Sequence, residues 1–213
     1  ATQNAGADAY NVAVGYNAGT AVTTGVSNTL IGGLGGDAIT TGDRNTAVGY
    51  SSLSTTTTAD FNTALGAFSL SDNTTGASNT ALGYYALAVH TTGANNTAVG
   101  AGAGDAITTG AQNTVLGSAA LSALTTATRN TAVGYAALEA STNDDNTAVG
   151  AFSLWSNTSG YYNVAMGYLA GGAITTSHSN TAIGSFALRA NTTASYNTAV
   201  GTSALTANTT GTS

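Results

Sequence analysis

Asn45-Thr46-Ala47-Val48-Gly49-Tyr50 is a phrase that returns, with small changes, along the whole chain. Its asparagine recurs every 17 residues, with one step of 16 between Asn130 and Asn146. Repetition at a short fixed period is the sequence signature of a solenoid. The repeat therefore predicts a single elongated domain over residues 1–213. The repeated asparagines are Asn11, Asn28, Asn45, Asn62, Asn79, Asn96, Asn113, Asn130, Asn146, Asn163, Asn180 and Asn197.

The two ends of the chain fit the same pattern. Residues 1–10 match the second half of a repeat, and residues 11–213 hold twelve copies. Neither end carries the atypical polar repeat that normally caps a solenoid. We expect the chain to be a segment of a longer fibre.

The composition excludes several classes of function. Charged residues make up only 6% of the chain and the net charge is -6, whereas nucleic-acid binding needs a cationic surface. There is no cysteine, and no apolar run is long enough to span a bilayer. We expect no nucleic-acid partner and no membrane insertion in this segment.

Position four of the repeat, counted from the asparagine, is apolar in every copy and includes Val48, Leu65 and Leu82. A column of branched apolar residues is typical of the core face of a short strand, so we assign these residues to the core. Strand alternation then turns the alanine at position three outward, where a flat apolar column suits packing against another chain.

Positions nine and twelve vary together. Where position nine is glycine, as at Gly36, position twelve is aliphatic, as at Ile39. Where position nine is leucine, as at Leu53 and Leu70, position twelve is polar in all copies but one. A close-packed interior tolerates neither a vacancy nor an extra side chain. We therefore predict one core slot that either position fills.

Glycine stands at position five in every copy and often at position fifteen, where we expect corners with positive φ. Short β-branched segments, no proline and no helical apolar stripe predict an all-β fold, a parallel β-solenoid of about twelve 17-residue coils. A contour of at most about 56 Å per coil leaves room for two or three short strands.

So thin a coil buries little apolar surface, and association is the expected remedy. The alanine column, the small eighth position (for example Ala86, Ala103 and Ala120) and the large and small residues exchanged between positions six and seven offer a repeated apolar surface. We predict a homotrimer.

Two polar columns are predicted to be structural ladders. The asparagines, among them Asn45, Asn62 and Asn79, are expected to bond along the rod and cap the turn. Threonine is invariant at position thirteen, as at Thr57, Thr74 and Thr91, and its hydroxyls can satisfy corner backbone groups. A regular threonine array is also compatible with ordering water, as in ice-binding solenoids.

No group of residues points to catalysis, a metal or a cofactor. His90 and His178 occupy different repeat positions and lie outside any ligand cluster. Asp37, Asp105 and the pair Asp144-Asp145 are interpreted as solvated turn acids, because the calcium-binding nonapeptide is absent. We expect a protein that is not an enzyme.

An aromatic group breaks the repeat just after its shortened copy, which we expect to distort the stack. It consists of Phe152, Trp155, Tyr161 and Tyr162. Aromatic faces stack on glycans and equally well pack at a subunit seam, so both a glycan-binding spot and a packing role stay open.

The phrase Asn-Thr-Ala-Val-Gly-Tyr, followed by small-Leu and Thr-Thr-Gly, resembles repeats of phage tail-fibre-like proteins and the head repeats of trimeric autotransporter adhesins. The resemblance implies a left-handed parallel β-roll in a homotrimer, outside the cell on a virion or a bacterial surface. It further implies attachment to a host or surface, with a cell-surface glycan or receptor as partner. An ice-binding or surface-layer solenoid is the alternative.

Overall fold

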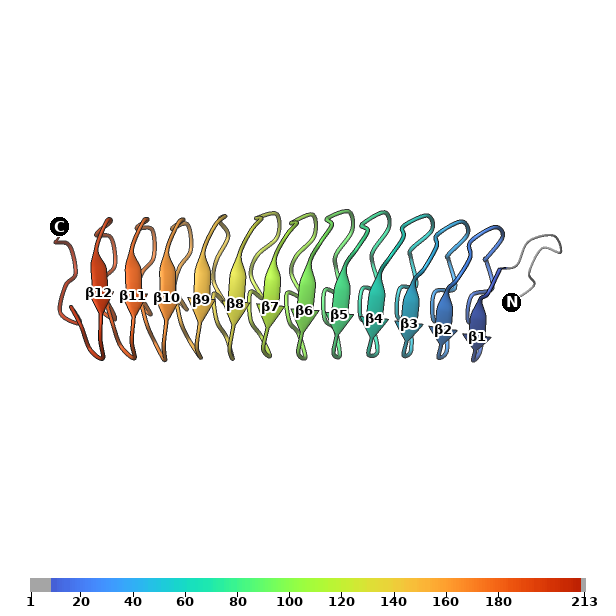
Figure 1. Cartoon of the computed structure of the whole chain (residues 1–213), viewed down its shortest axis with the longest axis horizontal. Coiled ribbons are helices and arrows are strands. Elements are labelled where there is room, and N and C mark those ends of the chain that lie inside the picture. The colour runs from blue at the N-terminus through green and yellow to red at the C-terminus, as the bar shows by residue number, and fades with distance from the viewer. Residues whose placement is uncertain (1–8, 212–213) are drawn as a thin grey trace.

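A computed structural model describes residues 9–211, which form an all-β parallel solenoid (Figure 1). Most of the predicted partial repeat, residues 1–8, and the last two residues of the predicted domain lie outside this range. Each coil contributes one strand of three residues. The strands are β1 (Val12–Val14), β2 (Thr29–Ile31), β3 (Thr46–Val48), β4 (Thr63–Leu65), β5 (Thr80–Leu82), β6 (Thr97–Val99), β7 (Thr114–Leu116), β8 (Thr131–Val133), β9 (Thr147–Val149), β10 (Val164–Met166), β11 (Thr181–Ile183) and β12 (Thr198–Val200).

The strands form one parallel sheet in chain order, β1 to β12, which confirms the predicted parallel β-solenoid. Equivalent residues pair, so that Thr46 lies opposite Thr63. The 16-residue step keeps this register, with Thr131 opposite Thr147. The predicted distortion at the shortened copy is therefore absent from the sheet.

The remainder of each coil is made of turns, so the expectation of two or three strands per coil was wrong for residues 9–211. Backbone hydrogen bonds still join neighbouring coils there. The amide of Leu70 donates to the carbonyl of Ala86 at 3.1 Å, and that of Thr91 to the carbonyl of Thr108 at 2.7 Å. Each coil is thus hydrogen-bonded to the next through its turns as well as through its strand.

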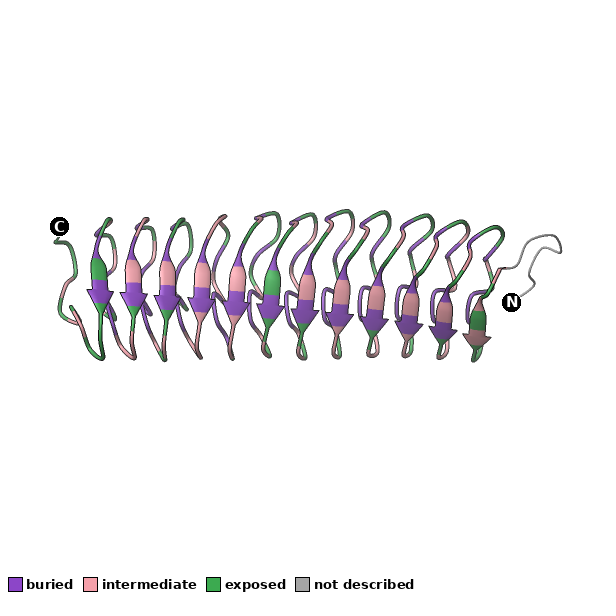
Figure 2. Cartoon of the chain, viewed as in Figure 1, coloured by how far each residue is buried: buried purple, intermediate pink, exposed green. Residues whose placement is uncertain are grey.

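The strand faces are the reverse of the predicted ones. Position three is the buried position of β2 to β12, as Ala47 and Ala64 show with no exposed surface (Figure 2). Position four points outward: Leu65 is 47% exposed, and Val48 and Leu82 are partly exposed. The assignment of Val48, Leu65 and Leu82 to the core was wrong. The alanine column and the buried eighth position (Ala86, Ala103 and Ala120) offer no surface to another chain.

The narrow interior explains the reversal. Leucines at position nine, such as Leu53 and Leu70, are fully buried and fill the core from the side opposite the sheet. A Cβ added at Gly171, a position-nine glycine, would lie 3.7 Å from the Cβ of Ala165 across the coil. Position three is therefore small in most coils, and Val115 in β7 is the largest residue that lies there together with a leucine at position nine, Leu121.

Leu30 is the larger of two exceptions to alanine at position three of β2 to β12, and it supports this explanation. It occupies position three, and the coils of β1 and β2 both carry glycine at position nine. Cβ atoms added at Gly19 and Gly36 would each come within 2.6 Å of the Leu30 side chain. Leu30 extends from the sheet side into the space that the two glycines leave, beside Ile39, whose Cδ1 would lie 2.9 Å from a Cβ added at Gly36.

The predicted exchange between positions nine and twelve is confirmed outside the coil of β7, where Leu121 and Leu124 are both fully buried. Ile39, Ile107 and Ile174 are fully buried in coils with glycine at position nine. At Gly171, an added Cβ would lie 3.0 Å from Cδ1 of Ile174 and 2.9 Å from Cδ2 of Leu154 in the preceding coil. Both side chains therefore occupy the space that a leucine would take.

Glycine at position five has the expected positive φ, such as 138° at Gly49, where an added Cβ would lie 2.5 Å from the carbonyl oxygen of Gly66. Glycine at position fifteen differs from the prediction, because its φ is not positive. It is needed for close approach: a Cβ at Gly42 would lie 2.5 Å from the carbonyl oxygen of Ala59. Positive φ recurs instead at positions seven, nine and seventeen, for example 48° at Leu70.

The asparagine side chains link each coil both to itself and to its neighbour. The Asn45 amide donates to the Ala59 carbonyl of its own coil at 2.8 Å, and its Oδ1 accepts the backbone N–H of Asn62 at 2.9 Å. Asn62 and Asn79 continue the same pattern. The link along the rod thus runs from side chain to backbone, and in several coils the amides also bond directly to each other, as Asn96 Nδ2–H does to Asn79 Oδ1 at 3.1 Å.

The threonines at position thirteen form a more exposed column. The hydroxyl of Thr74 donates to the carbonyl of Thr91 at 2.9 Å, and that of Thr91 to Thr108 at 3.0 Å. Thr57 takes part through its carbonyl, which accepts the hydroxyl of Thr40 at 3.1 Å.

The core-slot explanation predicts a compensating pair of substitutions in the coil of β10. Ile174→Asn alone should leave a cavity and cost about 2–5 kcal/mol, and Gly171→Leu alone should overpack the core and cost about 1–3 kcal/mol. Together they recreate the neighbouring pairs Leu154 with Asn157 and Leu188 with Asn191. Urea unfolding should show the double variant to be much less destabilised than the sum of the single ones; additive losses would contradict a shared slot.

Candidate functional site

The predicted aromatic group divides into two parts. Phe152 follows β9 and lies beside Trp155, with ring centroids 6.0 Å apart. Tyr161 and Tyr162 lie just before Asn163 and β10, with their ring centroids 5.2 Å apart. The two pairs therefore lie toward opposite ends of adjacent strands and do not form one site.

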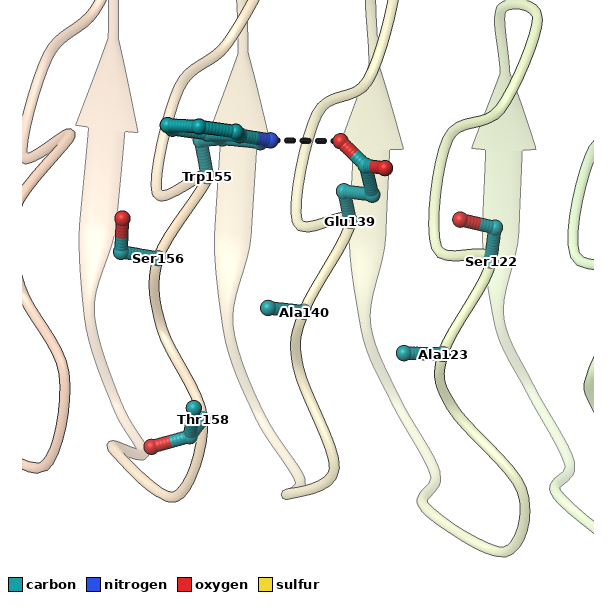
Figure 3. Close-up of a pocket in the computed structure, with 7 residues that line it drawn as sticks. All are labelled: Ser122, Ala123, Glu139, Ala140, Trp155, Ser156 and Thr158. Atoms are coloured by element: carbon teal, nitrogen blue, oxygen red, sulfur yellow. Dashed lines mark hydrogen bonds between the residues drawn. The ribbon is translucent and has the colours of Figure 1, made fainter.

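A hollow of about 450 Å³ lies beside Trp155, on the side of the rod away from the sheet (Figure 3). It spans the coils of β7, β8 and β9. Successive copies of positions ten and eleven supply most of its lining. The lining side chains are therefore evenly spaced from coil to coil but differ in chemical type. The lining residues are Ser122, Ala123, Glu139, Ala140, Trp155, Ser156 and Thr158.

Trp155 is held in place by two contacts although it is 44% exposed. Its indole N–H donates to the carboxylate of Glu139 in the preceding coil (Figure 3). Phe152 packs against it at an interplanar angle of 83°. Glu139 and Ser122 were missed at the sequence level, although aligning the copies places Ser122, Glu139 and Trp155 at one repeat position in consecutive coils.

Aromatic rings at positions six and seven form a row along the edge where the strands end. The row alternates between the two positions from coil to coil: Tyr135, Phe152, Tyr168 and Phe186, with centroids 5.3–6.2 Å apart and near-perpendicular planes. Edge-to-face packing favours this alternation. Exchange of large and small residues between positions six and seven thus places neighbouring rings side by side along the rod.

The second aromatic cluster lies at the edge where the strands begin. Tyr161 stacks on His178 in the next coil at 4.8 Å and 11°, and His178 meets the edge of Tyr196 one coil further on at 5.0 Å. Copies of positions sixteen and seventeen supply these rings. The cluster packs coil against coil.

The outward face of the sheet carries a strip formed by positions two and four of β1–β12, here called the sheet strip. Position two is threonine in all strands but β1 and β10. Position four is aliphatic throughout, and its exposure is 37% at Val99, 47% at Leu65 and 43% at Met166. The sheet strip is therefore a long surface of mixed methyl and hydroxyl groups.

The acidic residues differ from the predicted solvated turn acids. Asp145 pairs with Arg129 through two hydrogen bonds of 2.7 and 2.9 Å, and the guanidinium lowers the pKa of Asp145. Asp144 accepts the backbone N–H of Thr128 at 2.8 Å. Burial raises the pKa of Asp37 and Asp105, each of which has one buried carboxylate oxygen without a hydrogen-bond partner.

His90 replaces an asparagine of the core. It is fully buried, and its Nε2–H donates to the carbonyl of Gly93 at 2.8 Å. Asn157 makes the equivalent bond to Gly160 at 3.1 Å. Burial lowers the pKa of His90, and its Nδ1 has no hydrogen-bond partner. His90 therefore has a structural position.

No protein-family model matches the chain, and neither the curated proteins nor the solved structures include a significant match to it. Within residues 9–211, no three acidic or histidine side chains gather closely enough to hold a metal ion. The same part of the chain contains no helix with the length and apolar character needed to cross a membrane.

The buried His90 should make the rod sensitive to acid. Because its pKa is lowered in the fold, the unfolded chain binds the proton more tightly, and stability should fall as the pH drops below about 6.5, at a rate of at most about 1.4 kcal/mol per pH unit. His90→Asn keeps the bond to Gly93 and removes the titration. Thermal melting at pH 7.5 and 5.5 should show a smaller acid-induced loss in His90→Asn than in the wild type. An equal loss in both would refute this role.

Proposed function

We propose that the chain is a non-enzymatic structural segment of an extracellular fibre, the shaft or head of a virion tail fibre or of a bacterial surface adhesin. Its task is to hold binding sites at a distance and to present them in several copies for attachment to a host or surface. The single observation that supports this proposal most strongly is the sheet strip, whose aliphatic column is exposed or partly exposed along the whole row of stacked coils.

The sheet strip favours association with further copies of the chain. Eleven strand-to-strand steps of about 4.8 Å give it a length of about 53 Å. A three-residue strand is about 10 Å long, so the sheet strip alone covers roughly 530 Å², and flanking corner residues would supply the rest of the roughly 800 Å² that a stable interface takes from each partner. Exposed apolar surface of this extent on a soluble protein marks an interaction site.

A homotrimer is the proposed assembly, with the left-handed winding that the resemblance to fibre and adhesin repeats implies. In a closed trimer, each sheet strip turns toward the common axis, and the opposite side of each rod faces solvent. The threonines at position two then meet aliphatic residues of neighbouring chains, while the hollow beside Trp155 stays accessible.

The proposed homotrimer predicts the molecular mass of the protein in solution. Sedimentation equilibrium at micromolar concentration should give three times the chain mass of 20.6 kDa. Leu65→Lys combined with Val99→Lys should yield a folded monomer, because two charges would be buried in each interface. Thr75→Lys with Thr109→Lys is the matched control: it adds the same charge to the same coils at exposed positions and should remain trimeric. A monomeric wild type would contradict the proposal.

An ice-binding or surface-layer solenoid is the second candidate, and one observation favours the ice-binding form. On the sheet strip, threonine hydroxyls and aliphatic methyls alternate at the regular spacing of a parallel sheet. A thermal-hysteresis assay separates the two functions: activity in the wild type that is lost in Leu65→Lys with Val99→Lys would favour ice binding.

A further inference from the structure

The hollow beside Trp155 differs from the other departures from the repeat. Leu30, the isoleucines at position twelve and His90 all occupy buried positions, where they complete the core. Trp155 is the only tryptophan of the chain, and it stands at a surface position that is occupied by small or polar residues in most other copies. A large, partly exposed side chain at such a position contributes little to the core, which points to a role in binding.

We propose that this hollow binds a neutral carbohydrate, with a hexose stacked on the indole of Trp155. The inference rests on the proposed attachment function, for which it names the site and the class of ligand. Aromatic rings offer an apolar face to the C–H groups of a sugar ring, and the surrounding polar groups address its hydroxyls.

The indole is oriented before any ligand arrives. Phe152 packs edge-on against it at 6.0 Å, and Glu139 accepts its N–H. In Figure 3 the ring is seen edge-on, and one of its faces looks toward Ser156 and Thr158 across the hollow. A side chain already fixed in its bound orientation loses little conformational entropy on binding.

The floor of the hollow leaves room for a flat ligand. Ala123 and Ala140 contribute only methyl groups: Ala140 lies on the coil next to Trp155, and Ala123 lies one coil further along the rod (Figure 3). The volume of about 450 Å³ falls within the range of small-molecule sites. A mono- or disaccharide fits this space.

The polar groups favour a neutral sugar over an acidic one. The Glu139 carboxylate uses one oxygen for the indole N–H, and a carboxylate has further acceptor positions for sugar hydroxyls. Ser122 and Ser156 add hydroxyls at opposite sides of the hollow. The carboxylate, together with a net charge of -6, disfavours sialic and uronic acids.

The test uses the full chain on an array of neutral and acidic glycans, followed by isothermal titration with the methyl glycoside of the best neutral hit. The wild type should bind neutral glycans, and its single tryptophan should change its fluorescence on binding. Trp155→Ala should abolish binding. Glu139→Gln keeps the shape but loses the charge-assisted hydrogen bonds, and should weaken binding by about tenfold or more.

Tyr162→Ala is the matched control, because it removes an exposed aromatic ring at the other end of the strands and should leave binding unchanged. The proposal is overturned if no neutral glycan binds, if acidic glycans are preferred, or if Trp155→Ala binds as the wild type does. Sedimentation of the same samples keeps the two proposals apart. A trimer without glycan binding refutes the hollow alone, and a monomer that binds glycan through Trp155 refutes the assembly alone.

Discussion

The buried asparagine column is the interaction on which the rest of the rod depends. Each Oδ1 accepts the backbone N–H of the asparagine in the next coil, at 2.7–3.1 Å from Asn28 to Asn197. In most coils the same amide also donates to the carbonyl fourteen residues later, which closes the coil. An unpaired amide in this interior would be costly, so every coil must bring its asparagine within hydrogen-bond distance of the asparagine in the previous coil. Where the coil is one residue short, Asn130 turns to the carbonyl of Thr128 instead, and the sheet register is kept.

The narrow core that results decides which residues face outward. Leucine at position nine fills the interior from one side, so position three is restricted to alanine in most coils. Strand alternation then sends both threonine and the aliphatic residue of position four to the surface. The same geometry that makes the coil compact leaves an apolar strip on the sheet, and it places successive copies of position ten side by side on the opposite face. Repetition therefore provides both a candidate assembly surface and the spacing from which the hollow beside Trp155 is built.

Much of the fold follows from the period alone. The repeat of asparagine and the β-branched triplets predict parallel coils, and the covariation of Gly36 with Ile39 or Leu70 with Asn73 identifies a shared core slot. The sequence predicts the wrong buried face of the strand because Ala64 and Leu65 are both apolar, and hydrophobicity alone favours the larger residue for the core. Only the volume contributed by Leu70 from the far side settles the question, and a single-strand pattern does not contain that information. For the hollow, the sequence alone indicated Trp155. The contact with Glu139 follows only from the stacking of neighbouring coils, and Tyr161 and Tyr162 lie in a different cluster.

The asparagine column can be tested with two adjacent residues. Asn96 is 1% exposed, donates to Gly110 and accepts from Asn113, whereas Asn95 beside it is exposed. Replacing either by aspartate changes one amide into a carboxylate of the same shape. Asn96→Asp buries a charge opposite a carbonyl and removes a donor, which should cost about 3 kcal/mol or more. Urea unfolding at pH 7 should show this loss for Asn96→Asp and a change within about 0.5 kcal/mol for Asn95→Asp. Equal stability of the two variants would contradict the central role of the column.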